Sequence, residues 1–155
     1  VRKFFNPAGC CRGSNKAYIG NLVVFFITVD RFSQFLLGTG HIKDIILDLT
    51  RKSSCIIVGR CSDFLLQNEP NVLNIFIYAP YKARLENCVH TLEMSEEDAK
   101  RTIMKVDKAR SAYHKRYAGY FPADPMHKHL MIDSSLLGVE GTADLIAEVV
   151  RRKFQ

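Results

Sequence analysis

The stretch Cys55-Ile-Ile-Val-Gly-Arg-Cys-Ser-Asp63 places a short, continuous apolar run directly before a glycine and an arginine. A second apolar run, rich in Ile and Phe, covers residues 72–79, and a third covers residues 130–132. Short apolar runs without polar alternation are typical of strands that are buried on both faces of a sheet. The sequence therefore predicts buried strands at residues 55–58, 72–79 and 130–132.

Helical patterns separate these runs. The spacing of apolar residues and the cap residues predict helices over residues 42–52, 61–67, 81–93, 95 to about 117, and 142–153. Thr142 is the expected cap of the last helix. Strands that alternate with helices favour an α/β fold with three layers, in which helices cover both faces of a parallel sheet.

Residues 1–40 show no clean period, apart from an apolar run at residues 22–29. This run is far shorter than the ~20 residues of a membrane-spanning helix, so we interpret it as a strand or helix of the fold and expect no membrane association. No linker divides the chain, which predicts a single domain over residues 1–155. The chain begins with Val1 rather than Met, which leaves open that it is a fragment.

The composition is that of a globular protein, with 155 residues of which 47% are hydrophobic and 25% charged. It excludes collagen-like, low-complexity and largely disordered chains. The formal net charge of +6 favours anionic partners. The 5 cysteines include no CxxC pair, so neither a zinc module nor a disulfide framework is indicated, and we expect reduced thiols in a cytoplasmic protein.

Chemistry is expected where the predicted strands end, because ligands of parallel sheets bind outside the carboxyl ends of the strands. Arg60 follows the first strand and is suited to bind a phosphate or carboxylate through two hydrogen bonds. A solvated arginine that ends the strand is the alternative. Asp63 either pairs with Arg60 or binds a ligand hydroxyl or amine, and a simple cap or exposed acid is the alternative. Arg84, just past the second strand, either faces the same edge or extends into solvent.

The helix from Ser95 carries a third arginine of interest. At 100° per residue, Arg110 falls on the apolar face with Ile103 and Tyr117. An inward arginine is costly unless it is paired or binds an anion. Asp107 is close enough to orient it, and a purely structural Asp107–Arg110 pair is the alternative. A basic stripe roughly opposite, which we interpret as a solvated face, consists of Arg101, Lys105, Lys108 and Lys115.

Three arginines at one sheet edge favour a small polyanionic ligand such as a nucleotide. No Ser/His/Asp or Cys/His set for nucleophilic catalysis is visible. Asp124, His127 and His129 share a loop, but loop histidines are usually exposed and unliganded, so no metal site is predicted. Nucleic-acid binding through the basic stripe and residues 151–153 is disfavoured, because no nucleic-acid-binding motif accompanies them.

Several motifs, in order along the chain, resemble the cytidylate kinase-like family. They are the opening stretch, Asn71-Val-Leu-Asn-Ile-Phe-Ile-Tyr-Ala-Pro80, Ser95-Glu-Glu-Asp-Ala-Lys100, Lys105-Val-Asp-Lys-Ala-Arg-Ser-Ala-Tyr113 and Ile132-Asp-Ser-Ser-Leu-Leu-Gly-Val-Glu-Gly-Thr142. The resemblance covers about residues 42–150. It implies the fold of the P-loop nucleoside monophosphate kinases. It also implies transfer of the γ-phosphoryl group of ATP, with Mg²⁺, to CMP or a related nucleoside monophosphate.

The resemblance also implies roles for single residues. Arg60 matches an arginine that faces the acceptor nucleotide, and we assign Asp63 to the same substrate site. Arg84, Asp107 and Arg110 match catalytic positions, the last two on a helical lid, about residues 95–118, that closes over the phosphates. Phosphoryl transfer needs positioned cations rather than a protein nucleophile, which agrees with these residue types.

Two features depart from the family pattern. Cys61 stands where an aspartate is typical, with the acid displaced to Asp63, so the nucleobase preference is open. The glycine-rich phosphate loop is not found, since residues 9–16 fail its spacing and follow no predicted strand.

We therefore expect a cytidylate kinase-like domain that binds nucleoside mono- and triphosphates. If the chain is complete, little or no phosphotransfer is expected, because the loop that holds ATP is missing. The alternative is a non-catalytic nucleotide-binding or partner-binding remnant of the fold. Whether the chain forms a homo-oligomer stays open.

Overall fold

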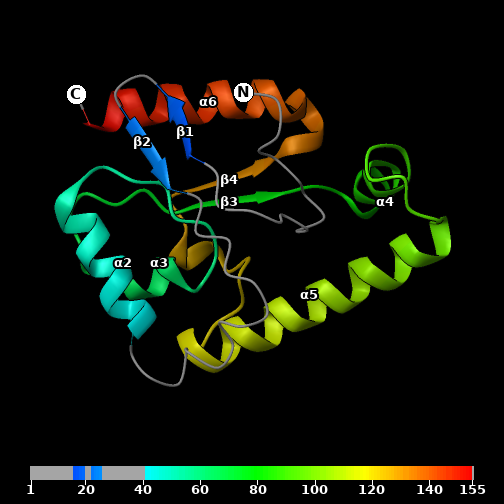
Figure 1. The fold of residues 1–155 in the computed structure, drawn as a ribbon, viewed down its shortest axis with the longest axis horizontal. Helices are drawn as coiled ribbons and strands as arrows, with labels where there is room; N and C mark the ends of the chain where they lie inside the picture. Colours follow the sequence, from blue (N-terminus) through cyan, green and yellow to red (C-terminus); the bar gives the residue numbers. More distant parts are fainter. Residues whose placement is uncertain (1–15, 20–21, 26–40, 155) are drawn as a thin grey trace. The chain divides into compact units, whose positions relative to one another are not determined.

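The computed structural model of the chain describes residues 16–19, 22–25 and 41–154 (Figure 1). These residues fall into two compact units, the first within Cys11–Glu69 and the second within Pro70–Gln155. The single-domain organisation expected from the sequence stays a prediction. No helix in the described part of the chain is both long enough and apolar enough to cross a membrane.

The first unit opens with a strand pair. β1 (Lys16–Ile19) and β2 (Leu22–Phe25) are antiparallel, with Lys16 opposite Phe25. β2 confirms a strand for the first half of the apolar run at residues 22–29, while residues 26–29 lie outside the described residues. Two helices follow at the expected places, α2 (His41–Lys52) and the short α3 (Ser62–Leu65).

The prediction of a strand at residues 55–58 is wrong. The sequence predicts a buried strand there, whereas the structure has an irregular segment between α2 and α3. An apolar run indicates burial, but a strand also needs a neighbour for its backbone hydrogen bonds, and neither strand pair of the described residues includes this segment. Val58 is 55% exposed, so the run is not fully buried either.

A left-handed turn leads from this segment into α3. Gly59, Arg60 and Cys61 have positive φ angles of 77°, 60° and 51°. The amide of Ser62 donates to the carbonyl of Gly59 at 3.1 Å and closes the turn. A side chain makes this conformation costly by roughly 1–2 kcal/mol per residue. Arg60 therefore stands in a strained turn at the start of α3.

The second unit contains the parallel strands. β3 (Ile75–Tyr78) pairs with β4 (Leu130–Asp133), and Tyr78 lies opposite Asp133 at the carboxyl end. This confirms the parallel pairing of the second and third predicted strands. Each of the two sheets formed by the described residues has two strands. The mixed α/β class is therefore confirmed, and the three-layer sheet stays a prediction.

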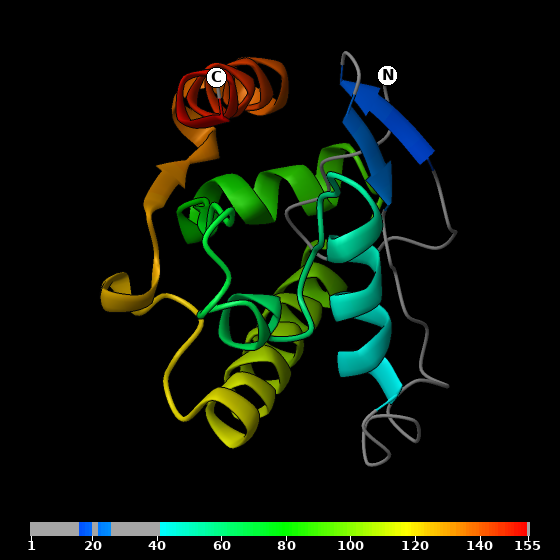
Figure 2. The same ribbon diagram turned by 90° about the vertical axis from the view of Figure 1, so that its left-hand side faces the viewer.

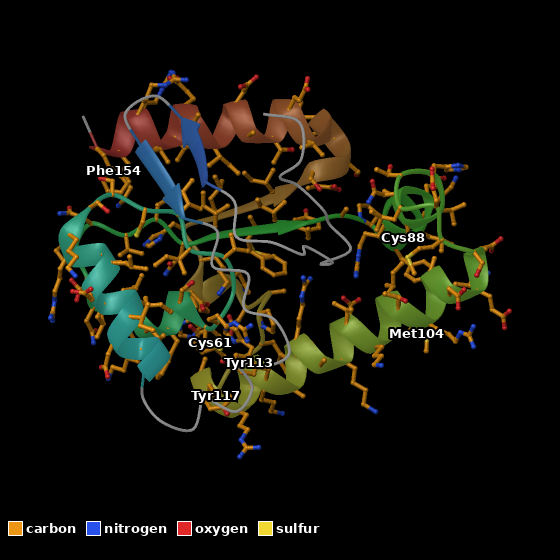
Figure 3. The ribbon with its side chains drawn as sticks, viewed as in Figure 1. Cys61, Cys88, Met104, Tyr113, Tyr117 and Phe154 are labelled. Carbon is orange, nitrogen blue, oxygen red and sulfur yellow. The ribbon has the colours of Figure 1, made fainter. Side chains whose placement is uncertain are left out.

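α4 (Tyr81–His90) and α5 (Glu96–Ala118) pack on each other through a small core. Cys88 and Ala99 are fully buried, and Ile103 is 2% exposed. Figure 3 shows Cys88 on α4, where α4 faces α5. Around these three residues pack the half-buried apolar side chains Leu85, Val89, Leu92 and Met94. This contact fixes the first half of α5 against α4.

The ends of α5 agree with the prediction of a helix from Ser95 to about residue 117. The Ser95 hydroxyl accepts a hydrogen bond from the amide of Asp98 at 3.1 Å and donates one to the Asp98 carboxylate at 2.7 Å. Gly119 ends the helix with a φ of 85°, a conformation that glycine adopts without a side-chain clash. Local capping thus sets the length of this helix.

α6 (Ser134–Phe154) follows β4 directly, as Figures 1 and 2 show. Gly138, with a φ of 68°, interrupts it near its start. The expectation that Thr142 caps the last helix is wrong. Thr142 lies inside the helix, is fully buried, and its hydroxyl donates to the Gly138 carbonyl at 2.6 Å. A threonine within a helix can make this bond to the carbonyl four residues earlier.

Candidate functional site

An ion pair joins α4 to α5 beside the carboxyl end of β3. Arg84 lies in the first turn of α4, where its amide donates to the carbonyl of Pro80 at 3.1 Å. Its guanidinium donates two hydrogen bonds to the two carboxylate oxygens of Asp107, at 2.8 and 2.7 Å. The hydrogen bonds that Arg84 donates to Asp107 raise the pKa of Arg84 above its usual value. The sequence-predicted residues Arg84 and Asp107 therefore meet.

This pair extends the α4–α5 core by one helical turn. Arg84 precedes the buried Cys88 by four residues, and Asp107 follows the buried Ile103 by four. The Arg84 side chain is 17% exposed and that of Asp107 is 46% exposed. A two-pronged hydrogen bond between planar groups also fixes their orientation. The pair therefore ties the middle of α5 to the start of α4.

Arg110 stands one turn beyond Asp107 and is exposed. On the helical wheel it lies about 20° from Ile103 and about 40° from His114, which are 2% and 8% exposed. The inner face of α5 is thus buried before and after Arg110 but open at it. The alternative of a structural Asp107–Arg110 pair is wrong, because Asp107 binds Arg84. Within the described residues, Arg110 has no ion pair.

Polar groups also gather at the carboxyl ends of the parallel strands. The Ser134 hydroxyl donates to the carbonyl of Tyr78 at 3.0 Å and so bridges the ends of β4 and β3. Asp133 accepts hydrogen bonds from the amide and hydroxyl of Ser135 at 2.9 and 2.7 Å. The sequence predicts a strand end here but indicates no role for these residues. The strand register is the information it lacked.

Arg60 and Asp63 belong to the first unit, whereas Arg84, Asp107 and Arg110 belong to the second. Arg60 is half-buried in the strained turn, and Asp63 is half-buried in the first turn of α3. Both take part in interactions with other groups. Their assignment to the acceptor nucleotide stays a prediction.

The three loop residues weighed as metal ligands have other partners. Asp124 accepts the amide of Met126 at 3.0 Å and caps the short 3-10 helix η2 (Pro125–His127). His127 stacks on Tyr120 with ring centroids 3.6 Å apart. His129 accepts the amide of Asn74 on its Nδ1 atom at 2.9 Å. Each side chain thus stabilises local structure.

Comparison with solved structures shows the fold. A structure titled as an uncharacterized protein from Eubacterium ventriosum ATCC 27560 superposes with a TM-score of 0.68 at 20% sequence identity. The superposition covers 83% of this chain and 81% of that one. At this identity the likeness concerns the fold alone. A comparison with curated protein sequences found no match.

A comparison with models of protein families matches the part of the chain that contains the candidate site. The model of the cytidylate kinase-like family matches residues 31–136. This segment contains all five predicted site residues, which are Arg60, Asp63, Arg84, Asp107 and Arg110. It begins before the resemblance seen in the motifs and ends before residues 137–150, which the motifs included. Because the match spans more than half of the sequence, the chain belongs to the cytidylate kinase-like family.

Proposed function

We propose that this chain binds the phosphate of a nucleoside monophosphate, CMP or a related nucleotide, as the acceptor of a phosphoryl transfer. The observation that carries the proposal is Arg110, an exposed guanidinium on the face of α5 that also carries the buried Ile103 and His114. A guanidinium in this position can bind a phosphate through two hydrogen bonds. Family membership supports the same ligand class.

In this proposal Arg84 and Asp107 position the helix that carries Arg110. Their charges largely cancel, because both carboxylate oxygens of Asp107 accept from Arg84. Asp107 and Arg110 are three residues apart on α5, so fixing one fixes the direction of the other. Phosphoryl transfer depends on positioning and on compensating charge, and this arrangement supplies both for the acceptor phosphate.

The resemblance implies ATP as the donor and Mg²⁺ as the cofactor, and we keep both as part of the proposal. The donor side has less support in the structure. The described residues contain no group of three or more His, Cys, Asp or Glu side chains that could hold a metal. Residues 9–15 of the candidate phosphate loop lie outside the described residues. We therefore assign no residue to ATP or Mg²⁺.

The three-layer parallel sheet of the P-loop kinases is part of the same proposal. Two observations support it, the parallel pairing of β3 with β4 and the likeness to a solved structure over most of both chains. In such sheets the ligand binds at the carboxyl ends of the strands. Arg84 follows β3 at that end.

Titration calorimetry with CMP tests the proposal. We expect heat of binding with the wild-type chain and a loss of affinity of about tenfold or more with Arg110→Ala, since a hydrogen bond to a charged group contributes about 1.5–3 kcal/mol. Lys153→Ala is the matched control, because it removes one exposed positive charge from the end of α6. It should bind CMP as the wild type does.

The results of the titration and of an activity assay distinguish an active kinase from a non-catalytic nucleotide-binding protein. No heat with the wild type, or equal affinity in Arg110→Ala, contradicts the assignment. A coupled assay with ATP, Mg²⁺ and CMP then tests transfer. Turnover of about 1–100 per second indicates an active kinase. Binding of CMP without turnover favours the non-catalytic nucleotide-binding alternative. Circular dichroism of each variant checks that the fold is intact.

A further inference from the structure

The outer face of α5 carries a basic stripe that the proposed nucleotide site does not use. We call it the α5 stripe, and it consists of Lys105, Lys108, Lys115 and Arg116. All four side chains are exposed, and on the helical wheel they fall within an arc of about 100°. Arg110 lies about 170° from the centre of this arc. The stripe and the candidate nucleotide site therefore occupy opposite sides of one helix.

Acidic groups do not neutralise the α5 stripe within the described residues. In the acidic first turn of α5, Glu96 pairs with Lys100 and Asp98 with Arg101, while the exposed Glu97 lies about two turns before Lys105. Asp107 binds Arg84 on the other side of the helix. Ala112 is also exposed and lies inside the arc, and its small side chain does not project between the lysines. This face therefore concentrates positive charge where a partner can approach closely.

An exposed aromatic ring adjoins the stripe just beyond the C-terminal end of α5. The Lys115 ammonium lies 5.1 Å from the ring centroid of Phe121, and the Arg116 guanidinium lies 5.8 Å from that of Tyr117. Phe121 is 55% exposed, whereas Tyr117, which is 43% exposed, lies about 20° from Arg110 on the helical wheel and therefore on the opposite side of α5 from the stripe. Figure 3 shows Tyr117 near the end of α5. Cations beside exposed rings are the combination that binds unpaired nucleotides, by backbone attraction and base stacking.

We propose that the α5 stripe binds a single-stranded nucleic acid, with its phosphates along the basic side chains and a base against Phe121. The Phe121 ring favours a single strand over a duplex, because it needs an unpaired base to stack on. From Lys105 to Arg116 the helix rises about 17 Å, which is long enough for several consecutive phosphates of one strand to contact the stripe. The contact of Lys115 with the exposed Phe121 ring is the feature that a sequence without a nucleic-acid-binding motif did not show.

Fluorescence anisotropy with the full chain and a labelled oligouridylate of about 12 nucleotides tests the proposal. We expect the triple variant Lys105→Ala/Lys108→Ala/Lys115→Ala to bind about tenfold more weakly or worse. The slope of log affinity against log salt should fall by about 2, at about 0.7 per lost phosphate contact. Phe121→Ala should weaken binding about fivefold without changing that slope.

The matched control is Arg151→Ala/Arg152→Ala/Lys153→Ala, which removes the same charge from the end of α6. It should keep the wild-type affinity. Equal weakening by both triple variants overturns the proposal, as does a wild type that does not bind. Equal binding of the duplex, or tighter binding to anionic vesicles with Phe121→Ala unchanged, also overturns it. Lys108→Glu, a single change on an exposed side chain, serves if the triple variant does not fold.

The CMP titration keeps this inference separate from the proposed function. The stripe variants should retain the heat of CMP binding, because their side chains lie on the opposite side of α5 from Arg110. Arg110→Ala should retain the affinity for the oligonucleotide. Loss of both ligands in either variant would place them at one site and overturn the inference.

Discussion

The Arg84–Asp107 ion pair differs from the exposed ion pairs of the described residues in geometry and in burial. Both partners use two atoms, and Arg84 is only 17% exposed. In the Asp48–Lys52 pair on α2, by contrast, the side chains are 57% and 68% exposed. Partial burial strengthens a charge pair, whereas exposed pairs of this second kind contribute little.

A double-mutant cycle should show this difference. We expect a coupling free energy of about 1 kcal/mol between Arg84→Ala and Asp107→Ala, reduced from the value for a buried pair because Asp107 is partly exposed. The same cycle on Asp48 and Lys52 should give less than about 0.5 kcal/mol. Denaturant unfolding of the single and double variants measures both. A coupling no larger than the control would mean that the pair does not hold α5.

Cys88 should be unreactive in the folded chain. It is fully buried, and burial raises the pKa of its thiol above the usual value. Since the thiolate is the reactive form, we expect iodoacetamide to modify Cys88 only after unfolding. Mass spectrometry of the alkylated peptides, with and without denaturant, measures this. Rapid modification in the native state would show that the α4–α5 core opens.

The raised pKa of Cys88 predicts in which direction the stability of the chain changes with pH. The stabilising contribution of the neutral, buried Cys88 thiol is complete below its unfolded pKa of about 8.5. It is lost as the pH rises through the higher pKa of the folded state, because only the unfolded chain gains from ionisation in between. Denaturant midpoints between neutral and alkaline pH should therefore fall more in the wild type than in Cys88→Ala.

At the scale of elements, the start of α5 depends on one side chain. Ser95→Ala removes the hydroxyl that caps the helix and should cost about 1 kcal/mol of unfolding free energy. The Ser95 hydroxyl, and then Arg101, lower the pKa of Asp98. This part of the stabilisation is present above the unfolded pKa of about 4 and is lost as the pH falls through the folded pKa.

The difference between wild type and Ser95→Ala should therefore narrow in acid without vanishing, because the bond from the Asp98 amide does not titrate. Denaturant unfolding at neutral pH and in acid measures the two differences. If the stability difference between wild type and Ser95→Ala is the same at both pH values, the Asp98 carboxylate does not contribute to the cap.

His129 joins the segments that lead into the two parallel strands, β3 and β4. Its Nδ1 atom accepts the amide of Asn74, just before β3, and its own amide donates to the Asn74 carbonyl at 2.9 Å. His129→Ala removes the first bond and should cost about 1 kcal/mol. His90→Ala, at an exposed position at the end of α4, is the control and should change stability little. Equal effects in both variants would contradict this role.

At the scale of the whole molecule, ligand binding should appear as global stabilisation. A ligand that binds only the folded chain adds about 2.7 kcal/mol at 100 times its Kd. For a chain of this size, CMP should then raise the Tm by about 5–10 °C. Thermal melts of the wild type and of Arg110→Ala, with and without CMP, check this. A shift of the same size in Arg110→Ala would place the nucleotide elsewhere.

The order of the elements could largely be predicted from local patterns. Helical spacing and the Ser95 cap predicted α5 to within a residue at each end, and the apolar runs at residues 72–79 and 130–132 became β3 and β4. Residues 55–58 show the limit of such patterns. Their apolar character is as strong, yet strand formation also needs a hydrogen-bonding partner, which a single segment does not specify.

The residues of the candidate site could also be predicted in part from the sequence, but their partners could not. Residue types and strand ends identified Arg84, Asp107 and Arg110 as residues of interest. The wheel placed Arg110 on the inner face of α5 and suggested Asp107 as its partner. Asp107 is instead bound by Arg84, which is 23 residues away in the sequence and reaches α5 only because the two helices pack. A helical wheel describes one helix, so it cannot show a partner on another.

By itself, the sequence determined the α/β class, the positions of most helices, the parallel strands and the motifs of the cytidylate kinase-like family. These depend on local periodicity and residue type. The tertiary structure alone decided which charges meet and which stay exposed, namely the Arg84–Asp107 pair, the open Arg110 and the α5 stripe with the Phe121 ring beside it. The physical reason is that ion pairing and exposure depend on the distances between elements, which packing sets.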